Sequence, residues 1–310
     1  MKRIIYLLSL CISLLAYSES ATAQYYFYDD DYYDTPVTFE VGGSIGAMNC
    51  LTDIGGAKGI GKRFIKDLNM GTTSFCGGVY INAMYKNAVA LRLEGTFGQV
   101  SANDNVLKNV NPLDIAYQRY NRNTSFRSRI SEVSLTLELH PLFMFINYQE
   151  RESDPPRLSP YLLAGVGFYS FNPQSQLKNG NWVDLQPLST EGQGFTKYTD
   201  KKPYKLQQMN FPVGLGLKYE LSSLLNLRGE FVYRVLTTDY LDDVSTTYSD
   251  PLWYGDYFTG TKYDNAMEMR DRQINKVTGA GGKRGSPKQK DAFFTFNLKL
   301  GLTLGRERIR

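Results

Sequence analysis

The chain has 310 residues, of which 35 are Lys or Arg, 31 are Asp or Glu and one is His, so its formal net charge is +4. This near balance points to no strongly charged partner and gives no support to nucleic-acid binding. With 23 Tyr, 17 Phe and 28 Gly, the chain is rich in strand-forming residues and in the aromatic residues that ring membrane barrels.

The N-terminus has the pattern of a secretory signal peptide. Two basic residues precede an apolar run over residues 4–17, and an Ala-x-Ala motif ends at Ala23. The run is shorter than the roughly 20 apolar residues that a spanning helix needs, and no later stretch reaches that length. We therefore expect cleavage after residue 23, which removes residues 1–23 and leaves a periplasmic segment over residues 24–36.

From residue 37 onward, apolar and polar residues alternate with the period of a β-strand. In the last such segment the even positions from Phe294 to Leu304 are all apolar, whereas the odd positions between them are polar or Gly. Strands of about 9–11 residues with one apolar and one polar face are typical of transmembrane barrels. We expect eight of them, at residues 37–50, 72–85, 88–100, 129–146, 159–173, 209–221, 226–237 and 293–305.

The connections between these segments alternate between long and short, and the short ones are residues 86–87, 147–158 and 222–225. In small outer-membrane barrels, short turns face the periplasm and long loops face the cell exterior. The sequence therefore predicts an all-β fold, an eight-stranded antiparallel transmembrane β-barrel over residues 37–305 in the cell outer membrane, with a periplasmic tail over residues 306–310. A soluble β-sandwich is the alternative, and it does not explain the alternating loop lengths.

By the same alternation, six acidic and five basic side chains point into the barrel. An eight-stranded barrel encloses just enough space for its own side chains, and buried charges persist when they are paired and hydrogen-bonded. We therefore expect ion pairs to close the lumen, which argues against an open pore. The expected inward set is Glu40, Arg92, Glu94, Glu138, Lys218 and Glu230, together with Glu132, Glu220, Arg228, Arg234 and Lys299.

Cys50 and Cys76 are the cysteines that remain after signal cleavage, and both are expected to point inward near the outer ends of adjacent strands. An oxidising compartment favours a disulfide between them. Two free thiols are the alternative, because adjacent strands do not guarantee the Cα separation of about 5.5 Å that the bond needs.

His140 is the only histidine. Catalysis by a triad would require a nucleophile within hydrogen-bond reach of the imidazole, and Ser134 lies too far along the same strand. We expect an interior histidine bonded to a carboxylate such as Glu138 or Glu40. The sequence thus predicts a protein that is not an enzyme and that uses no cofactor.

Asp239, Asp242 and Asp243 follow the seventh strand, and Asp53 lies on the first outer loop. Clustered carboxylates bind Ca²⁺ in many loops, but this spacing matches no dedicated calcium loop. An Asx-type cap that ends the strand is the favoured interpretation. The last outer loop is basic, which fits either a solvated loop or a contact with lipopolysaccharide; its basic residues are Arg270, Arg272, Lys276, Lys283, Arg284, Lys288 and Lys290.

Residues 46–56, 159–167 and 237–245 together resemble the PorG family, small outer-membrane barrels of the type IX secretion system. The segment Asp-Tyr-Leu-Asp-Asp-Val-Ser is the most specific part of this resemblance, whose motif residues are Asp53, Asp239, Tyr240, Asp242 and Asp243. The resemblance implies a non-enzymatic component of a protein transport machine. It also implies two periplasmic partners, a PorK-like lipoprotein and a PorN-like ring protein.

With this orientation, the segment over residues 24–36 and the turn over residues 147–158 face the periplasm. Aromatic residues supply contact area, and charges set register. Both segments combine these residue types, so they are the candidate binding surface for the periplasmic partners. The candidate residues are Tyr25, Tyr26, Tyr28, Asp30, Glu150, Arg151, Glu152 and Arg157. The alternative function is a stand-alone structural or adhesive barrel that acts through its extracellular loops.

Overall fold

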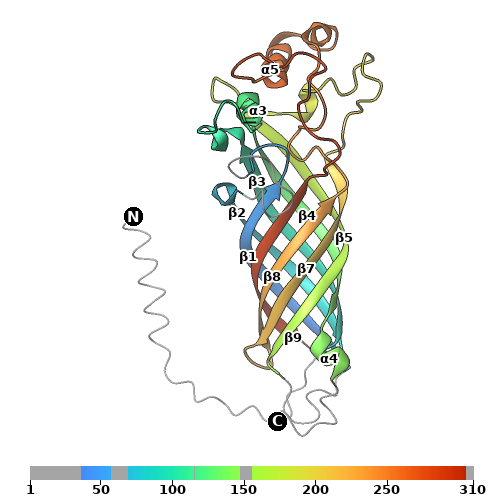
Figure 1. Ribbon diagram of the computed structural model, residues 1–310. Coiled ribbons are helices and arrows are strands. Elements are labelled where there is room, and N and C mark those ends of the chain that lie inside the picture. The colour runs from blue at the N-terminus through green and yellow to red at the C-terminus, as the bar shows by residue number, and fades with distance from the viewer. Residues whose placement is uncertain (1–35, 57–68, 115, 147–155, 305–310) are drawn as a thin grey trace.

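The computed structural model describes residues 36–56, 69–114, 116–146 and 156–304. Eight strands form a barrel in which each strand pairs with its neighbours in antiparallel fashion (Figure 1). The last strand pairs back with the first from Phe39–Leu304 to Leu51–Ala292, which closes the barrel. The strands are β1 (Val37–Leu51), β2 (Ser74–Tyr85), β3 (Val89–Asn103), β4 (Ser125–Leu139), β5 (Leu158–Gln176), β7 (Gln207–Glu220), β8 (Leu225–Leu236) and β9 (Ala292–Leu304).

The remaining elements belong to the connections. A three-residue strand, β6 (Trp182–Asp184), pairs with the outer end of β5 and takes no part in closing the barrel. None of the helices in the described part of the chain has the length and apolar character that a membrane crossing requires. These helices are η2 (Met70–Thr72), η3 (Asp104–Leu107), α3 (Tyr117–Arg122), α4 (Pro141–Phe145), η4 (Gln186–Leu188), η5 (Pro251–Asp256) and α5 (Gly260–Arg270).

Short connections lie at one end of the barrel and long loops at the other (Figure 1). The shortest connection joins β2 to β3 through Lys86 and Asn87, whose φ angles of 47° and 56° are both left-handed. Two consecutive left-handed residues make the type of turn that matches the twist of a two-stranded hairpin. The strand number and the alternation of connection lengths predicted from the sequence are confirmed, and the short end is the periplasmic end.

The fourth strand differs from its prediction at both ends. It begins at Ser125 rather than at residue 129, and it ends at Leu139 rather than at residue 146. The His140 amide still donates to the Ala88 carbonyl at 2.8 Å. Pro141 has no amide proton to continue the ladder, so the chain turns there into α4.

The two faces of the barrel wall have opposite chemistry. Side chains such as Leu93, Leu215 and Leu298 are exposed on the outside, whereas Arg92 and Lys299 are buried inside. The lumen changes character along its length, since at its outer end the inward side chains become apolar and join one hydrophobic core with the loops above. An apolar outer wall around a charged interior requires lipid rather than water around the barrel.

Candidate functional site

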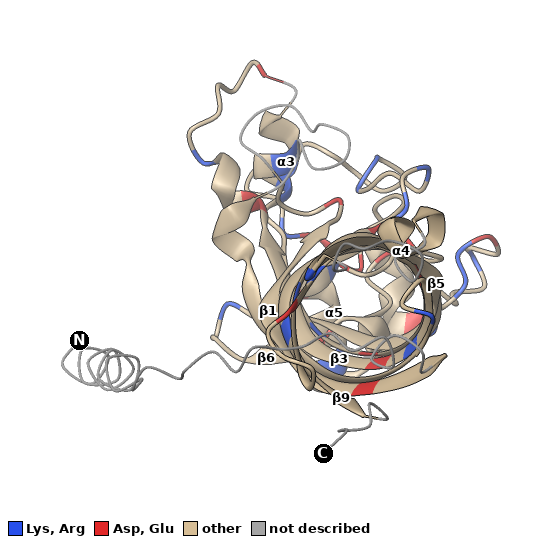
Figure 2. Ribbon diagram, turned by 90° about the horizontal axis from the view of Figure 1, so that it is seen from below, with Lys and Arg blue, Asp and Glu red and all other residues tan. Residues whose placement is uncertain are grey.

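The periplasmic half of the lumen is filled by a chain of ion pairs. Arg228 lies 2.8 Å from Glu40 and 2.9 Å from Glu138. Arg92 lies 2.9 Å from the other oxygen of Glu138 and 2.6 Å from Glu230. Figure 2, seen from the periplasmic end, shows acidic and basic residues on strands around the lumen. Each buried charge here therefore has at least one partner of opposite sign.

Lys299 extends this chain, because its Nζ atom lies 2.8 Å from Glu230 and 2.6 Å from Glu94. Lys218, which the sequence places in the same network, pairs with Glu220 at 3.7 Å. Charge alternates at every contact along the chain, so each desolvated charge lies beside one of opposite sign. In order, its members are Glu40, Arg228, Glu138, Arg92, Glu230, Lys299 and Glu94.

Two further layers close the lumen above this chain. Arg234 pairs with Glu132 at 3.0 Å, and Asn210 donates to the same carboxylate at 2.7 Å. Beyond this pair, the inward residues Phe126 and Phe293 are apolar and buried. A polar layer and then an apolar layer therefore occupy the lumen above the ion-pair chain.

We predict that the purified barrel shows no stable conductance in planar bilayers, because ion pairs and then apolar side chains fill its interior. Single-channel recording at both polarities tests this, with detergent buffer alone as the control for leak events. Reproducible unitary steps from the protein would contradict it.

His140 lies in a constellation that resembles a catalytic triad. Its Nδ1 atom lies 3.0 Å from Ser159 Oγ, and its Nε2 atom lies 3.5 Å from Glu138. From the sequence, Ser134 on the same strand was the only nucleophile considered for His140. The sequence does not show that pairing of β4 with β5 brings Ser159 next to His140. Ser159 is 3 % exposed, and two arginines already occupy Glu138. The buried serine and the neutralised carboxylate suit a structural role at the foot of the ion-pair chain.

The predicted disulfide is wrong, since Cys50 and Cys76 are both free and buried. Cys76 stands opposite Gly46 on β1, and Cys50 lies four residues further along that strand. At about 3.3 Å per residue the offset is roughly 13 Å, well beyond the Cα separation that a disulfide spans. The Cys76 thiol instead lies 3.3 Å from the Asn297 side-chain oxygen.

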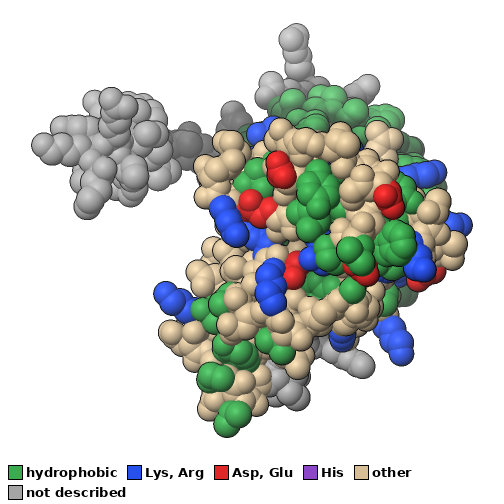
Figure 3. Space-filling model, turned by 90° about the horizontal axis from the view of Figure 1, so that it is seen from above, with side chains coloured by type: hydrophobic (Ala, Val, Ile, Leu, Met, Phe, Trp, Pro, Cys, Tyr) green, Lys and Arg blue, Asp and Glu red, His purple; other side chains and the backbone are tan. Residues whose placement is uncertain are grey.

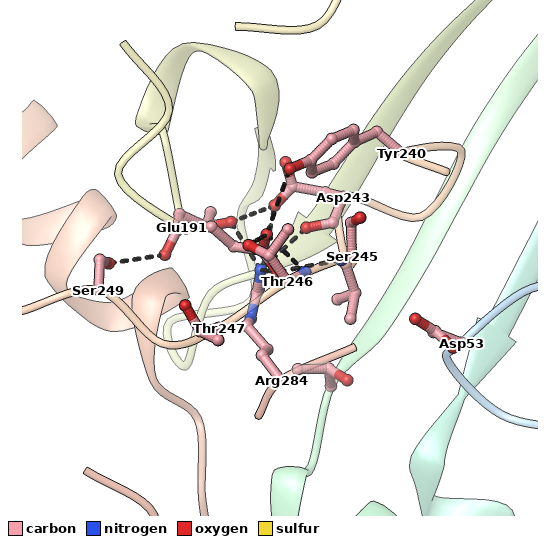
Figure 4. Close-up of polar contacts among 12 residues, drawn as sticks. Asp53, Glu191, Tyr240, Asp243, Ser245, Thr246, Thr247, Ser249 and Arg284 are labelled. Carbon is pink, nitrogen blue, oxygen red and sulfur yellow. Dashed lines mark hydrogen bonds and ion pairs between the residues drawn. The ribbon is translucent and has the colours of Figure 1, made fainter. Parts of the chain in front are cut away.

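The loops after β1, β3, β5 and β8 cover the outer mouth, and we call them the outer cap (described residues 52–56, 69–73, 104–114, 116–124, 177–206 and 237–291). Glu191 is its central acceptor, because its carboxylate accepts the Ser245 and Thr246 amides at 3.0 Å each (Figure 4). Arg284 donates to Glu191 at 3.1 Å and to the Asp243 carbonyl at 2.9 Å. These contacts join loops that lie far apart in the sequence.

Two of the predicted motif residues take part in this arrangement. The Asp243 carboxylate accepts the Tyr204 hydroxyl at 2.7 Å and the Thr190 hydroxyl. Tyr240 stacks on Tyr204, with ring centroids 4.8 Å apart. Nothing in the sequence singles out Glu191, since its contacts depend on how separate loops fold together.

Arg122, at the end of α3, makes a second junction. It binds both oxygens of Asp104 at 2.8 Å and donates to the carbonyls of Asp53 at 2.6 Å and Arg284 at 3.0 Å. Burial raises the pKa of Asp104, but the Arg122 charge and hydrogen bonds more than offset this, so the pKa lies below its ordinary value. Asp104 therefore stays ionised and holds Arg122 in place.

The basic last loop is used mainly to hold the outer cap together. Arg270 donates to the Ser249 carbonyl at 2.7 Å, and Arg272 donates to the Gln176 carbonyl at 2.6 Å. Arg284 is buried, whereas Lys283, Lys288 and Lys290 are exposed. The exposed basic surface is therefore smaller than the sequence alone indicates.

The periplasmic candidates fall mostly outside the described residues; these are Tyr25, Tyr26, Tyr28, Asp30, Glu150, Arg151 and Glu152. Arg157 is described and exposed, and its carbonyl accepts the Glu220 amide at 2.9 Å. The structure adds α4, an entirely apolar helix at the same end, in which Phe145 is 83 % exposed. The sequence analysis assigned these apolar residues to the end of the fourth strand and therefore did not predict the helix.

No family model matches the chain, and a search of curated proteins also gives no match. Among solved structures, the chain is similar to the N-terminal β-barrel domain of Pseudomonas aeruginosa OprF, with 10 % identity, 86 % of this chain and 97 % of that chain covered, and a TM-score of 0.34. It is also similar to Neisserial surface protein A (9 % identity, 85 % and 96 % covered, TM-score 0.37). A major outer membrane protein from Thermus thermophilus gives 11 % identity, 86 % and 99 % coverage and a TM-score of 0.39.

The geometry itself defines the class of protein. A closed antiparallel barrel of eight strands, with apolar side chains outside and paired charges inside, is an integral β-barrel of the outer membrane. Its described residues offer two surfaces outside the membrane, namely the outer cap and the periplasmic rim around α4.

Proposed function

We propose that the protein is a non-enzymatic outer-membrane component of a type IX secretion machine, which docks a periplasmic ring of PorK-like and PorN-like proteins to the membrane. The resemblance of residues 46–56, 159–167 and 237–245 supplies the identity of the partners. The closed lumen fits this function, because a docking component needs no pore of its own.

The observation that carries the proposal is α4 on the periplasmic rim. Met144 and Phe145 are exposed there, on a helix that begins two residues after β4 ends at Leu139 and that lies against β5. An exposed apolar helix at the periplasmic edge of the barrel suits a partner that carries acyl chains, because those chains lie in the inner leaflet at the level of the helix. A lipoprotein of the PorK type has this chemistry, and the exposed Arg157 next to the rim would set its register.

A second candidate function is a structural or adhesive barrel that works through its outer cap. The specific observation in its favour is that Leu113, Leu252 and Val277 are exposed on outer loops. Figure 3 shows apolar and charged side chains interspersed over this outer face. A binding partner at the cell exterior would cover such residues.

Photocrosslinking in cells separates the two functions. A photoreactive residue at Phe145 or Arg157 is expected to capture a PorK-like lipoprotein, whereas one at Leu252 in the outer cap is expected to capture none. Position Leu215 on the lipid-facing wall serves as the matched control and should give lipid adducts only. Protein adducts from Leu252 alone would contradict the docking function and would favour the adhesive one.

A further inference from the structure

Charged side chains on the barrel strands are distributed unequally between the two faces of the wall. Eleven of them point into the lumen, where each has a partner of opposite sign. Within the described strands of the barrel, only Arg127 and Arg129 point outward, and they alternate on β4 with the buried residues Phe126, Ser128 and Ile130. On these strands, the outer face of the wall therefore carries two positive charges at one place and no negative charge.

The apolar belt of the barrel ends just below the two arginines. On the adjacent strand β5, every outward side chain from Leu158 to Phe168 is apolar, and every one from Ser170 onward is polar. The ten residue steps from Leu158 to Phe168 span a height of roughly 25 Å, at about 3.3 Å per residue and a tilt of about 40°. This is the height of the lipid-facing band of a membrane barrel.

Arg129 lies a short distance above this belt, between Gln99 on β3 and Asn172 on β5. The last apolar side chains on the outside of these two strands are Phe97 and Phe168, two and four residues earlier. These offsets place the Arg129 Cα atom roughly 5–10 Å above the belt, where the polar headgroups of a bilayer lie. The long loops at this end face the cell exterior (Figure 1), so Arg129 lies among the headgroups of the outer leaflet.

The strand neighbours of the two arginines on the outside of the wall are neutral and polar. Arg127 stands between Ser101 on β3 and Gln174 on β5. Arg129 is exposed, and its side chain makes no hydrogen bond or ion pair with any described residue. Its guanidinium N–H donors therefore remain open to a partner from the membrane.

Arg127 is held in place by two neighbours. The Trp182 ring on β6 lies over its guanidinium, with 3.6 Å between Cζ and the ring centroid, and Gln174 Oε1 accepts its Nε–H at 3.1 Å. Trp182 is itself 41 % exposed, as is common for tryptophan at a membrane interface. These contacts use one face and one donor of the guanidinium and leave its terminal nitrogens available.

One acid, Asp184 on β6, stands opposite Gln174. Its carboxylate accepts the side-chain amides of Gln174 at 2.7 Å and of Asn172 at 2.9 Å, and it makes no ion pair with either arginine. Asp184 offsets part of the Arg127 charge. Arg129 is therefore the main anion-binding group, and Arg127 is the second.

An exposed cation at the headgroup level of the outer leaflet is complementary to an anionic headgroup. The outer leaflet of an outer membrane contains lipopolysaccharide, whose lipid A headgroup carries phosphate groups. A guanidinium binds phosphate through two parallel N–H donors. We infer that Arg129 and Arg127 bind a phosphate group of lipid A, whose acyl chains then lie against the apolar belt around Phe97 and Phe168. This surface is on the barrel wall, so the inference does not depend on the docking function of the periplasmic rim.

The test uses the full chain, refolded in detergent so that it carries no lipopolysaccharide and then placed in phosphatidylcholine nanodiscs. Lipid A, dephosphorylated lipid A or phosphatidylglycerol is added in small amount, and native mass spectrometry counts the molecules that the protein retains. The wild-type chain is expected to retain lipid A about tenfold better than its dephosphorylated form, because the two share their acyl chains and differ in charge-assisted hydrogen bonds. It should also prefer lipid A to phosphatidylglycerol, and added NaCl should weaken the binding.

Variants locate the surface. Arg127→Gln with Arg129→Gln should lower the retention of lipid A about tenfold or more. Lys288→Gln with Lys290→Gln is the matched control, because it removes the same charge from exposed positions of the basic last loop and should leave retention unchanged. Heat-modified gel mobility shows that each variant is folded, and the comparison of lipids on the wild-type chain does not depend on any variant.

Three results would overturn the inference. The first is equal retention of lipid A and its dephosphorylated form by the wild-type chain, and the second is equal retention of phosphatidylglycerol, which would indicate a surface for anionic lipids in general. The third is a folded arginine double variant that retains lipid A as well as the wild type or the lysine control does.

Discussion

Replacing Arg228 with Met is expected to lower the free energy of unfolding by about 3–5 kcal/mol, because it leaves the buried Glu40 carboxylate without an ion-pair partner and leaves Glu138 with Arg92 alone. Arg228 lies 2.8 Å from Glu40 and 2.9 Å from Glu138, and all three side chains are buried. Tyr80 also donates to Glu40 at 2.6 Å, so the lost charge also disturbs the Tyr80 side chain. Urea-dependent unfolding in lipid vesicles, followed by Trp fluorescence, measures the loss.

The matched control is Lys276→Met, which removes a cation that is 63 % exposed and that pairs with Asp271 at 2.9 Å. Its loss should stay below about 1 kcal/mol, as for other surface ion pairs. In the double variant Arg228→Met with Glu40→Gln, part of the loss should return, because one unpaired charge is removed. Equal losses for Arg228→Met and Lys276→Met would show that the lumenal pairs add no stability.

The sequence predicts which side chains point inward because a strand has a strict period of two. The alternation therefore places Glu40, Arg92 and Lys299 in the lumen, where the structure has them. It does not predict which charges meet. Arg92 and Glu230 lie 138 positions apart and touch across the lumen, so their contact depends on barrel closure and strand stagger.

The alternation of apolar and polar residues breaks down at the two ends of the barrel, where the strands leave the membrane. At the outer ends of the strands, apolar Phe126 and Ile130 face inward, so the contrast that marks a strand disappears and the start of β4 is missed. At the periplasmic end, Pro141 stops the ladder while the residues after it stay apolar. Strand register, which separates Cys50 from Cys76, is likewise not encoded by alternation.

In the outer cap, too, local contacts could be predicted from the sequence, whereas contacts between distant residues could not. The Asx-type turn at Asp242 spans two residues, from its side chain to the Val244 amide, and could be predicted because it is local. Glu191 comes from the loop after β5, and Asp291 lies at the far end of the loop that contains Asp242, so neither carries a local spacing signal. Asp291 accepts the Leu241 amide at 2.9 Å and lies near Asp242, so the sequence alone underestimates the negative charge gathered after β8.

Replacing Gly301 with Leu is expected to prevent folding or to cost about 3–5 kcal/mol, the sum of overpacking and a broken buried hydrogen bond. Gly301 pairs with Gly42 across β1 and β9, and both face the lumen. The Tyr80 ring fills the space that the two glycines leave, with its hydroxyl on Glu40. A Cβ atom at Gly301 would overlap the Tyr80 hydroxyl and the Glu40 carboxylate, so both would have to move.

Gly229→Leu on the neighbouring strand β8 is the matched control, because nothing lies within 4 Å of a Cβ atom built there. Residue 229 alternates with the inward Arg228 and Glu230 and therefore faces lipid, where an added Leu side chain is accepted. The folded fraction is measured by heat-modified gel mobility after refolding into vesicles, and the stability of any folded protein by urea titration. If Gly301→Leu and Gly229→Leu fold equally well, the Tyr80 ring does not depend on the glycine pair, and the lumen has more free space than the packing around Glu40 indicates.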